Sequence, residues 1–408
     1  MTVEPALRRA FNQAFSDDLF ARYRCRLEAQ VGPVPFQVAE TPLFLPRALA
    51  EEAAQATTEL IAQLGAPALA RELQRAVPVH LDVPGCEGLP ACATFDFAVA
   101  RRADGGLCAR IVELQAFPSI YAFTALQAQA WSDTLAEIPG FPPAPLLPYF
   151  GDDLRGPDAL QAATALLRRT LVGDADPETV VLVDLDPPQQ KTRPDFTATR
   201  LLVGIDTVCP SEISRQGRRL YRQRDGRRVP ITRIFNRIVF DELERKRFPV
   251  PWAWNEALEV TWVPHPNWYW LWSKFVLPKL DHPAVPKATL VSDLREPPRD
   301  LERCVLKPLF SYAGSGVIID VTAEDLARVP PAERAGWVLQ EKIEYARDLL
   351  MPDGGGVAAE VRILCLADPA TGTLRPAWNL VRLSRGKMCG VDHNRDMTWV
   401  GSSVGIWA

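Results

Sequence analysis

The chain has 408 residues, of which 47% are hydrophobic and 24% charged, and its formal net charge is −4 at pH 7. A chain of this length exceeds one ordinary hydrophobic core, so it predicts several lobes, and its mild acidity argues against nucleic acid as a partner. No apolar run reaches the roughly 18 residues of a membrane helix and the N-terminus lacks a signal-peptide pattern, so we expect a cytoplasmic protein without a membrane partner. The eight cysteines are scattered and the four histidines lack metal-ligand spacing, which favours reduced thiols over disulfides or zinc.

The first 93 residues are predicted to form helices that serve packing. Leu7, Phe11 and Phe15 recur at helical spacing, which is typical of an amphipathic helix. A second helix can begin at Pro46 and run to about Gln63. We therefore interpret residues 1–93 as a helical packing region and assign it no chemistry.

A β-hairpin with carboxylates is predicted next, within residues 94–150. The segments ATFDFAVARR and LCARIVELQ alternate apolar and polar positions and flank an Asp-Gly-Gly turn. Asp96 lies on the first strand, and Glu113 and Gln115 lie on one face of the second. Carboxylate and amide oxygens suit Mg²⁺, so these three residues are candidate metal ligands, although a solvated sheet face would show the same alternation.

Residues 151–250 predict a parallel, Rossmann-like layer. A helix over residues 158–171 is followed by a buried strand at 179–185, a helix from Pro194 to Gly204 and a strand near residues 206–208. The segment ITRIFNRIVF then reads as a strand that closes the layer. Because no G-x-G-x-x-G follows the first strand, we do not assign a dinucleotide site.

Six of the eleven tryptophans fall within residues 251–272. Aromatic platforms can stack nucleic-acid bases, but no basic residues are interleaved with these rings. We interpret the stretch as a junction between domains.

The segment VLKPLFSYAGSGV, residues 305–317, carries Lys307 at the end of a short apolar run, followed by a loop with Gly314 and Gly316. A lysine beside a loop of small residues suits the phosphates of a nucleotide, because backbone N–H groups can approach the oxygens. A hairpin turn with a solvated lysine is the alternative. Short strands and a helix follow, including residues 337–343, AAEVRILCL and WNLVRLS, so residues 251–408 predict an α+β arrangement.

These pieces resemble the ATP-grasp ligases, in which one lysine precedes a small lobe and a second lies before a glycine-rich loop. Lys274, Lys307 and the strand VLQEKI follow that order. The resemblance implies that the lysines neutralise phosphate charge, that the loop covers the phosphates, and that the strand end binds adenine. The implied nucleotide-binding residues are Lys274, Lys307, Ser311, Gly314, Ser315, Gly316, Gln340, Glu341, Lys342, Ile343 and Asn394.

The hairpin resembles the metal-binding segment of glutathionylspermidine synthase-like proteins, which are circularly permuted ATP-grasp members. Asp96 and Glu113 match the two carboxylates of that segment, Gln115 stands where asparagine is usual, and Thr94 replaces an arginine. The resemblance implies an α/β and α+β protein in which a Rossmann-like pre-ATP-grasp layer precedes a permuted ATP-grasp fold. An unpermuted arrangement would instead take its metal ligands from the following set: Glu360, Asp392 and Asn394.

The function implied by the resemblance is an ATP- and Mg²⁺-dependent ligase that joins a small-molecule carboxylate to an amine through an acyl phosphate. Lys307, Arg362 and Arg382 would stabilise charge during phosphoryl transfer. The resemblance covers only the synthetase part, so it implies neither glutathione nor spermidine as a substrate. The sequence leaves the oligomeric state open. An inactive nucleotide-binding protein and a small-molecule phosphotransferase are the alternatives.

Overall fold

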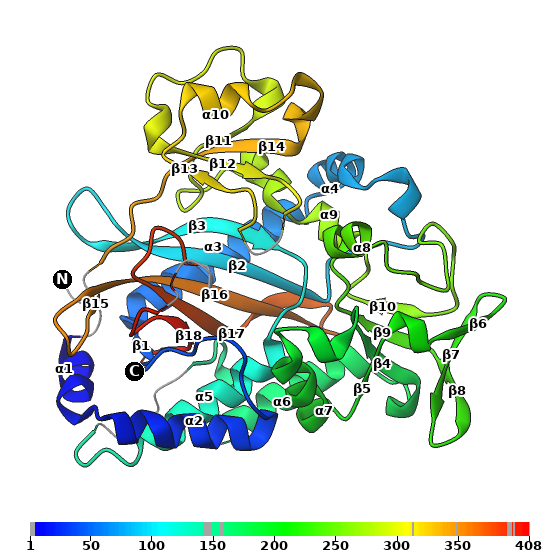
Figure 1. Ribbon diagram of the computed structural model, residues 1–408, viewed down its shortest axis with the longest axis horizontal. Helices are drawn as coiled ribbons and strands as arrows, with labels where there is room; N and C mark the ends of the chain where they lie inside the picture. Colours follow the sequence, from blue (N-terminus) through cyan, green and yellow to red (C-terminus); the bar gives the residue numbers. More distant parts are fainter. Residues whose placement is uncertain are drawn as a thin grey trace.

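The largest sheet of the protein joins two distant parts of the sequence (Figure 1). The computed structural model describes residues 5–141, 148–154, 158–311, 314–347, 349–389, 394 and 396–407. The predicted hairpin is confirmed and pairs antiparallel with a second hairpin far along the chain. The sheet follows the order β18, β17, β16, β2, β3, with β15 paired to β16. Its strands are β2 (Cys92–Arg101), β3 (Leu107–Gln115), β15 (Leu349–Leu350), β16 (Gly356–Asp368), β17 (Thr373–Ser384) and β18 (Gly401–Ser403).

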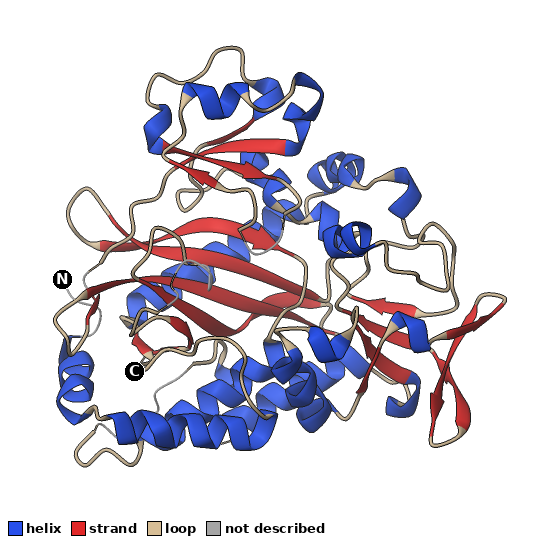
Figure 2. Cartoon of the chain, in the orientation of Figure 1, coloured by secondary structure: helices blue, strands red, loops and turns tan. Residues whose placement is uncertain are grey.

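Helices lie against this central sheet. The helix α3 (Arg47–Leu64) packs on β3, β16 and β17, close to the predicted bounds of 46–63. A group of helices lies below the sheet in Figure 2, and these are α1 (Pro5–Ala14), α2 (Asp17–Val31), α5 (Tyr121–Leu135), α6 (Ala159–Val172) and α7 (Arg193–Val203). The sequence did not lead us to predict α2, which buries Leu19, Tyr23 and Leu27 at a spacing of four residues.

The predicted parallel layer is confirmed and has four strands in the order β10, β9, β4, β5. Its strands are β4 (Val180–Val183), β5 (Asp206–Val208), β9 (Arg233–Asn236) and β10 (Thr261–Val263). The strand β10 lies inside the tryptophan-rich stretch and was not predicted. An antiparallel sheet extends from this layer through β6 (Ser214–Gln216), β7 (Arg219–Arg224) and β8 (Arg227–Ile231).

A small lobe has its own sheet and its own hydrophobic core. The sheet order is β11, β14, β12, β13, and all neighbours are antiparallel. Its elements are β11 (Ala288–Leu290), β12 (Cys304–Pro308), β13 (Ile318–Ile319), α10 (Ala323–Ala327) and β14 (Trp337–Glu341). The core comprises Val291, Leu301, Leu306, Val321, Leu326, Val329 and Leu339, apart from the large cluster that unites the rest of the protein. The domain boundaries expected from the sequence stay a prediction.

The tryptophan-rich stretch packs ring against ring beside the small lobe. Trp252 and Trp254 contact each other edge to face, and the ring centroid of Trp270 lies 4.9 Å from that of Phe310 in the loop after β12. Three short helices lie on this side of the molecule: α4 (Pro67–Leu73), α8 (Phe240–Lys246) and α9 (Trp268–Leu271). The rings therefore connect the parallel layer to the small lobe by packing.

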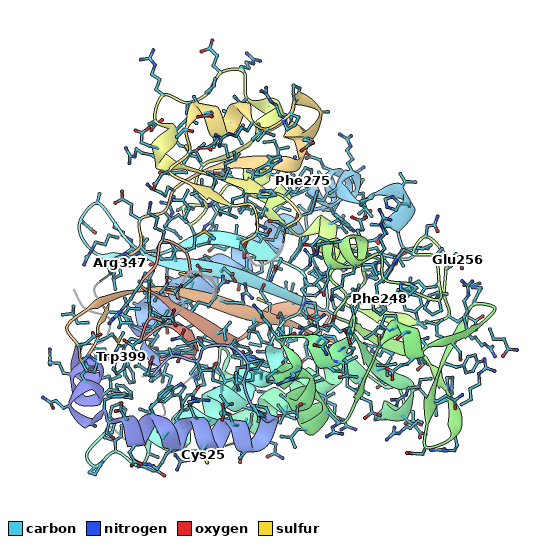
Figure 3. All side chains as sticks on the ribbon, in the orientation of Figure 1. Cys25, Phe248, Glu256, Phe275, Arg347 and Trp399 are labelled. Atoms are coloured by element: carbon cyan, nitrogen blue, oxygen red, sulfur yellow. The ribbon has the colours of Figure 1, made fainter. Side chains whose placement is uncertain are left out.

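The two ends of the described chain meet. The strand β19 (Gly405–Ile406) pairs in parallel with β1 (Leu43–Phe44), and the ring of Trp399, labelled in Figure 3, packs at a tilt against that of Phe15 with centroids 4.4 Å apart. None of the helices in the described part of the chain combines the length and apolar character that crossing a membrane requires.

Candidate functional site

Charged side chains form a row across one face of the central sheet. Asp96 pairs with Glu113 on one side and with Arg362 on the other, and Glu360 pairs with Arg382. Directly opposed residues of antiparallel strands share a face, and so do residues two apart on one strand. The register therefore gathers these five side chains on one face, although the sequence separates the first from the last by nearly three hundred residues.

Asp96 is held by two guanidinium groups. Arg362 binds it through two hydrogen bonds of 2.6 Å, from Nε to Oδ1 and from Nη2 to Oδ2. Arg382 Nη2 also donates to Oδ2. Asp96 is 1% exposed, so a buried carboxylate is neutralised by a planar, two-point contact of the kind that arginine forms best.

Glu360 belongs to the same network. It accepts hydrogen bonds from Arg382 and, at 2.9 Å, from the hydroxyl of Tyr345. Burial raises the pKa of Tyr345, and the adjacent Glu360 carboxylate raises it further, so this phenol stays protonated as the donor. Arg382 therefore bridges two carboxylates from two different strands.

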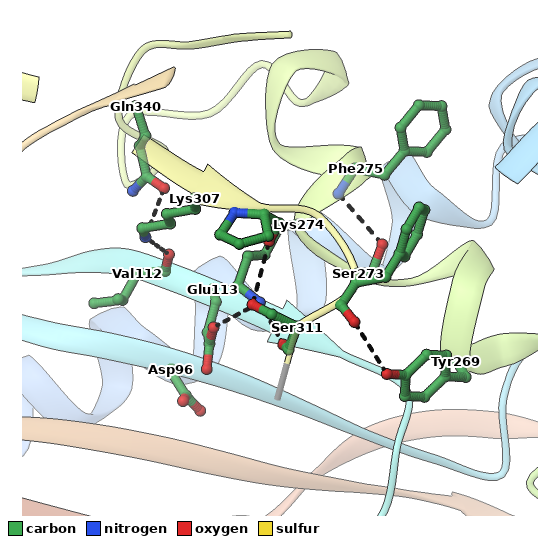
Figure 4. A network of polar contacts seen from close by, with 12 residues as sticks. Asp96, Val112, Glu113, Tyr269, Ser273, Lys274, Phe275, Lys307, Ser311 and Gln340 are labelled. Atoms are coloured by element: carbon green, nitrogen blue, oxygen red, sulfur yellow. Dashed lines mark hydrogen bonds and ion pairs between the residues drawn. The ribbon is translucent and has the colours of Figure 1, made fainter. Parts of the chain in front are cut away.

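Lys307 reaches from the small lobe to the central sheet. Its Nζ donates to Gln340 Oε1 at 2.8 Å within the lobe and to the main-chain oxygen of Val112 on β3 at 3.0 Å (Figure 4). Burial lowers the pKa of Lys307 to about 8, while Glu113 counteracts part of that shift. The ammonium is thus positioned across the interface between the lobes by two neutral acceptors.

Lys274 reaches the same region from a different element. It begins a 3-10 helix over Lys274–Lys279, and its Nζ donates to the main-chain oxygen of Ser311 at 2.9 Å. The same nitrogen lies 3.7 Å from Glu113 Oε2, as Figure 4 shows. Tyr269 donates its hydroxyl to the main-chain oxygen of Phe310 at 3.2 Å, so two side chains hold the loop that follows β12.

A small cleft lies between these elements. Glu113 and Gln115 face it from β3, and the side chain of Glu113 is 25% exposed. Burial alone would raise the pKa of Glu113, but Lys274, Arg382, Arg362 and Lys307 outweigh it and hold that pKa well below its usual range. The lining residues are Glu113, Leu114, Gln115, Phe117, Tyr269, Ser273, Lys274, Leu309, Phe310 and Ser311.

The glycine loop adopts backbone conformations that require glycine. Gly314 and Gly316 have φ values of +75° and +74°. A Cβ on Gly316 would lie 2.8 Å from Pro308 Cγ, and one on Gly314 would lie 3.0 Å from Met388 Cε. The loop therefore folds back on β12 and touches the segment that follows β17. Ser315 lies between the two glycines, and the neighbouring Tyr312 and Ala313 lie outside the described residues.

The predicted adenine-binding strand directs most of its polar groups to the rest of the small lobe, whereas its Glu341 carboxylate lies 3.6 Å from Arg110 of β3. Gln340 binds Lys307, whereas the main-chain N–H groups of Glu341 and Lys342 donate to the oxygens of Lys287 and Arg303. The Lys342 ammonium binds Asp320 at 2.6 Å. Ile343 follows the end of β14 and is half-buried.

Asn394 is brought to a different place from the cleft lysines. Its Oδ1 accepts hydrogen bonds from Ser384 Oγ and from the main-chain N–H groups of Arg385 and Gly386. The Asn394 side chain thus stabilises the turn of the segment that follows β17. Asp392, the other candidate of the unpermuted arrangement, lies outside the described residues.

The charge balance of the site does not fit a resident divalent cation. Four cations (Lys274, Lys307, Arg362 and Arg382) face three carboxylates (Asp96, Glu113 and Glu360), which leaves one excess positive charge. Both oxygens of Asp96 already accept hydrogen bonds from arginine. Among the residues that the structure describes, no group of three or more His, Cys, Asp or Glu side chains could hold a metal ion. We expected Arg362 and Arg382 to contact phosphate, and their contacts with Asp96 escaped the sequence analysis.

The fold and the site together define a mixed α/β protein with a cationic cleft between a small lobe and a large sheet. The chain is similar to the solved structure of a glutathione synthetase-like effector from Globodera pallida in its apo form, with 12% identity and a TM-score of 0.59. The alignment covers 97% of this chain and 98% of that one, so the protein has a glutathione synthetase-like fold. No family model matches the chain, and no curated protein matches it either.

Proposed function

We propose that the protein is a circularly permuted ATP-grasp ligase that binds ATP in the cleft between the small lobe and the central sheet. The observation that carries the proposal is the convergence of Lys274 and Lys307 on Glu113 from two separate elements. Lys274 lines the cleft, and Lys307 lies on the strand that leads into the glycine loop, so the two ammonium groups and the loop supply the charge and the backbone access that a polyphosphate needs. The likeness in fold to a glutathione synthetase-like protein supports the same class.

In this proposal the cleft residues act by position and charge. The polyphosphate takes over the lysine hydrogens that now bind the main-chain oxygens of Ser311 and Val112. The loop through Gly314, Ser315 and Gly316 covers the phosphates, and the end of β14 from Gln340 to Ile343 receives the adenine.

The proposed reaction joins a carboxylate to an amine. The carboxylate of one substrate attacks the γ-phosphate, ADP leaves, and the resulting acyl phosphate reacts with the amine to form an amide and phosphate. The protein supplies no covalent nucleophile, because the electrostatic environment stabilises the transferring phosphoryl group. Magnesium coordination by Asp96, Glu113 and Gln115 remains a prediction, which the arginine contacts of Asp96 oppose.

One observation favours a second candidate, a protein that binds nucleotide without turnover. The Asp96 carboxylate, which the family resemblance assigns to metal, is occupied by Arg362 and Arg382. A carboxylate that is fully paired with arginine is not free to position a reactive metal–phosphate complex.

Calorimetric titration with ATP tests the binding step. Lys274→Ala should weaken ATP binding about tenfold or more, because a charge-assisted contact to phosphate is lost. Lys279→Ala is the matched control, since Lys279 ends the same 3-10 helix but pairs with Glu72. Absence of ATP binding by the folded wild-type protein would contradict the proposal.

Turnover is tested separately by ADP release in the presence of pooled amino acids and polyamines. Release that depends on both a carboxylate and an amine supports the ligase. Binding without release, across acids and amines of varied size and charge, favours the second candidate.

A further inference from the structure

The arginine pair at Asp96 occupies the place where the family resemblance expects a metal ion. We propose that this cleft neutralises the polyphosphate of its nucleotide with its own side chains and binds the nucleotide without a divalent cation. The inference rests on the proposed function and specifies how that site handles charge. Arg362 and Arg382 then serve as fixed counter-charges in place of the ion.

Asp96 is already engaged by both arginines. Its two oxygens receive three hydrogen bonds from Arg362 and Arg382, and the residue is 1% exposed. These bonds occupy most of the acceptor sites of the carboxylate, and a metal ion beside it would meet two guanidinium charges. Arg362 is itself 7% exposed, so a metal ion that took over Asp96 would remove the two hydrogen bonds that hold this buried charge.

The net charge of the cluster also opposes a metal ion. Three cations form ion pairs with the carboxylates Asp96, Glu113 and Glu360, and the nearby Lys307 ammonium adds a fourth positive charge, so the cluster repels a divalent cation and attracts an anion. The remaining candidate ligand, Gln115, is a neutral amide that lines the cleft. Its NH₂ group can donate to a phosphate oxygen as readily as its carbonyl could accept a metal.

Arg382 has hydrogen-bond donors that its two carboxylate partners do not use. A single nitrogen, Nη2, serves both Asp96 and Glu360. The Nε atom is buried and has no hydrogen-bond partner within the described part of the protein. With a side chain that is 26% exposed, Arg382 can donate to an anion while it keeps both carboxylates.

Glu113 connects the arginines to the cleft lysines. Its Oε1 lies 3.9 Å from Arg362 Nη2, and its Oε2 lies 3.7 Å from Lys274 Nζ. A row of cations therefore extends from Lys307 of the small lobe to Arg382 of β17, with Glu113 between them. A chain of phosphates entering the cleft meets cations along this path, as a nucleotide bound without a metal ion requires.

The test compares ATP binding by the wild-type protein in excess EDTA and in Mg²⁺, at equal ionic strength, with metal-free tripolyphosphate as a second probe. We expect the two dissociation constants for ATP to agree within about threefold and tripolyphosphate to bind in EDTA. Binding of ATP that improves about tenfold or more with Mg²⁺ would overturn this inference and leave the proposed function intact. No binding under either condition would overturn both.

A variant adds an independent test. Arg382→Gln should weaken ATP binding in EDTA about tenfold and make it respond to Mg²⁺, because Asp96 and Glu360 lose a shared counter-charge. Arg375→Gln is the matched control on the same strand, since Arg375 pairs with Asp153. Equal affinities of Arg382→Gln and wild type in EDTA would contradict the assigned role, and circular dichroism of each variant checks that it is folded.

Discussion

Lys307 of the small lobe donates a hydrogen bond of 3.0 Å to the main-chain oxygen of Val112 in the central sheet. The bond joins two bodies with separate hydrophobic cores, and its donor is the lysine that we assign to phosphate. A phosphate that binds Lys307 competes directly with this contact. If the proposed nucleotide binds there, we expect it to weaken this contact between the small lobe and the central sheet.

Nucleotide affinity should depend on pH through Lys307. Burial lowers its pKa to about 8, so the ammonium is mostly charged at pH 7 and mostly neutral at pH 9. Because only the charged form attracts phosphate, affinity for ATP should fall by up to about tenfold between pH 7 and pH 9. Calorimetry across this range measures the effect. In Lys307→Met the decline should disappear, and a decline that persists there would assign it to another group.

Removing Arg362 should destabilise the fold. Arg362→Leu leaves Asp96 with one guanidinium partner in a buried environment, and such losses cost about 3 kcal/mol. Urea unfolding of the variant measures this cost. The double variant Asp96→Leu, Arg362→Leu should be more stable than Arg362→Leu alone, because the buried charge is gone. Equal stability of the single and double variants would contradict the view that the buried Asp96 charge causes the loss.

Much of the local structure was predictable from the chain. The hairpin of β2 and β3 follows from alternating residues around a turn at Gly105, where φ is +84°. The capped start of α10 follows from Thr322, whose side chain accepts a hydrogen bond from the N–H of Asp325. The turn and the helix cap both depend on residues that are close together in the sequence, so local sequence patterns predict them well.

The partners of the hairpin were not predictable in the same way. Asp96 pairs with Arg362 across β2 and β16, and a single sequence carries no mark of which strands pair at that distance. From the sequence we therefore expected Asp96 to bind metal and Arg362 to contact phosphate, and the pairing of the two was missed.

Two elements were missed for other physical reasons. The helix α2 has buried residues on one narrow stripe, Leu19, Tyr23, Leu27 and Val31, within an otherwise charged segment. That spacing of four residues was a usable signal. The strand β10 has only three residues, and one of its ends meets the proline-rich part of the tryptophan-rich stretch.

Replacing Gly316 should be harmful for two separate reasons, which are its positive φ and its close contact with Pro308. Gly316→Ala must adopt a φ of +74° and place its Cβ 2.8 Å from Pro308 Cγ. We expect a loss of about 1–2 kcal/mol in stability together with weaker ATP binding. The control is Gly372→Ala, which has a φ of +66° but meets open space. If both variants lose the same stability and neither changes ATP affinity, contact with β12 has no role in the site.

Asp184 should limit the stability of the protein near neutral pH. It follows β4, is 4% exposed and accepts a hydrogen bond of 2.7 Å from the main-chain N–H of Leu185. Burial raises its pKa to about 7, although Arg237 opposes part of the shift. Between pH 4 and 7 the native state thus retains a proton that the unfolded chain releases, so this group's contribution to stability falls as pH rises.

The side chain of the variant Asp184→Asn cannot ionise, so the loss of stability with rising pH should disappear. Its carbonyl can still accept the hydrogen bond from the main-chain N–H of Leu185. We expect Asp184→Asn to be more stable than wild type at pH 8 by about 1–3 kcal/mol, and the difference to shrink toward pH 4. Urea unfolding of both proteins at the two pH values measures it. A difference that is the same at pH 4 and pH 8 would mean that the Asp184 carboxyl does not titrate between these values in the folded protein.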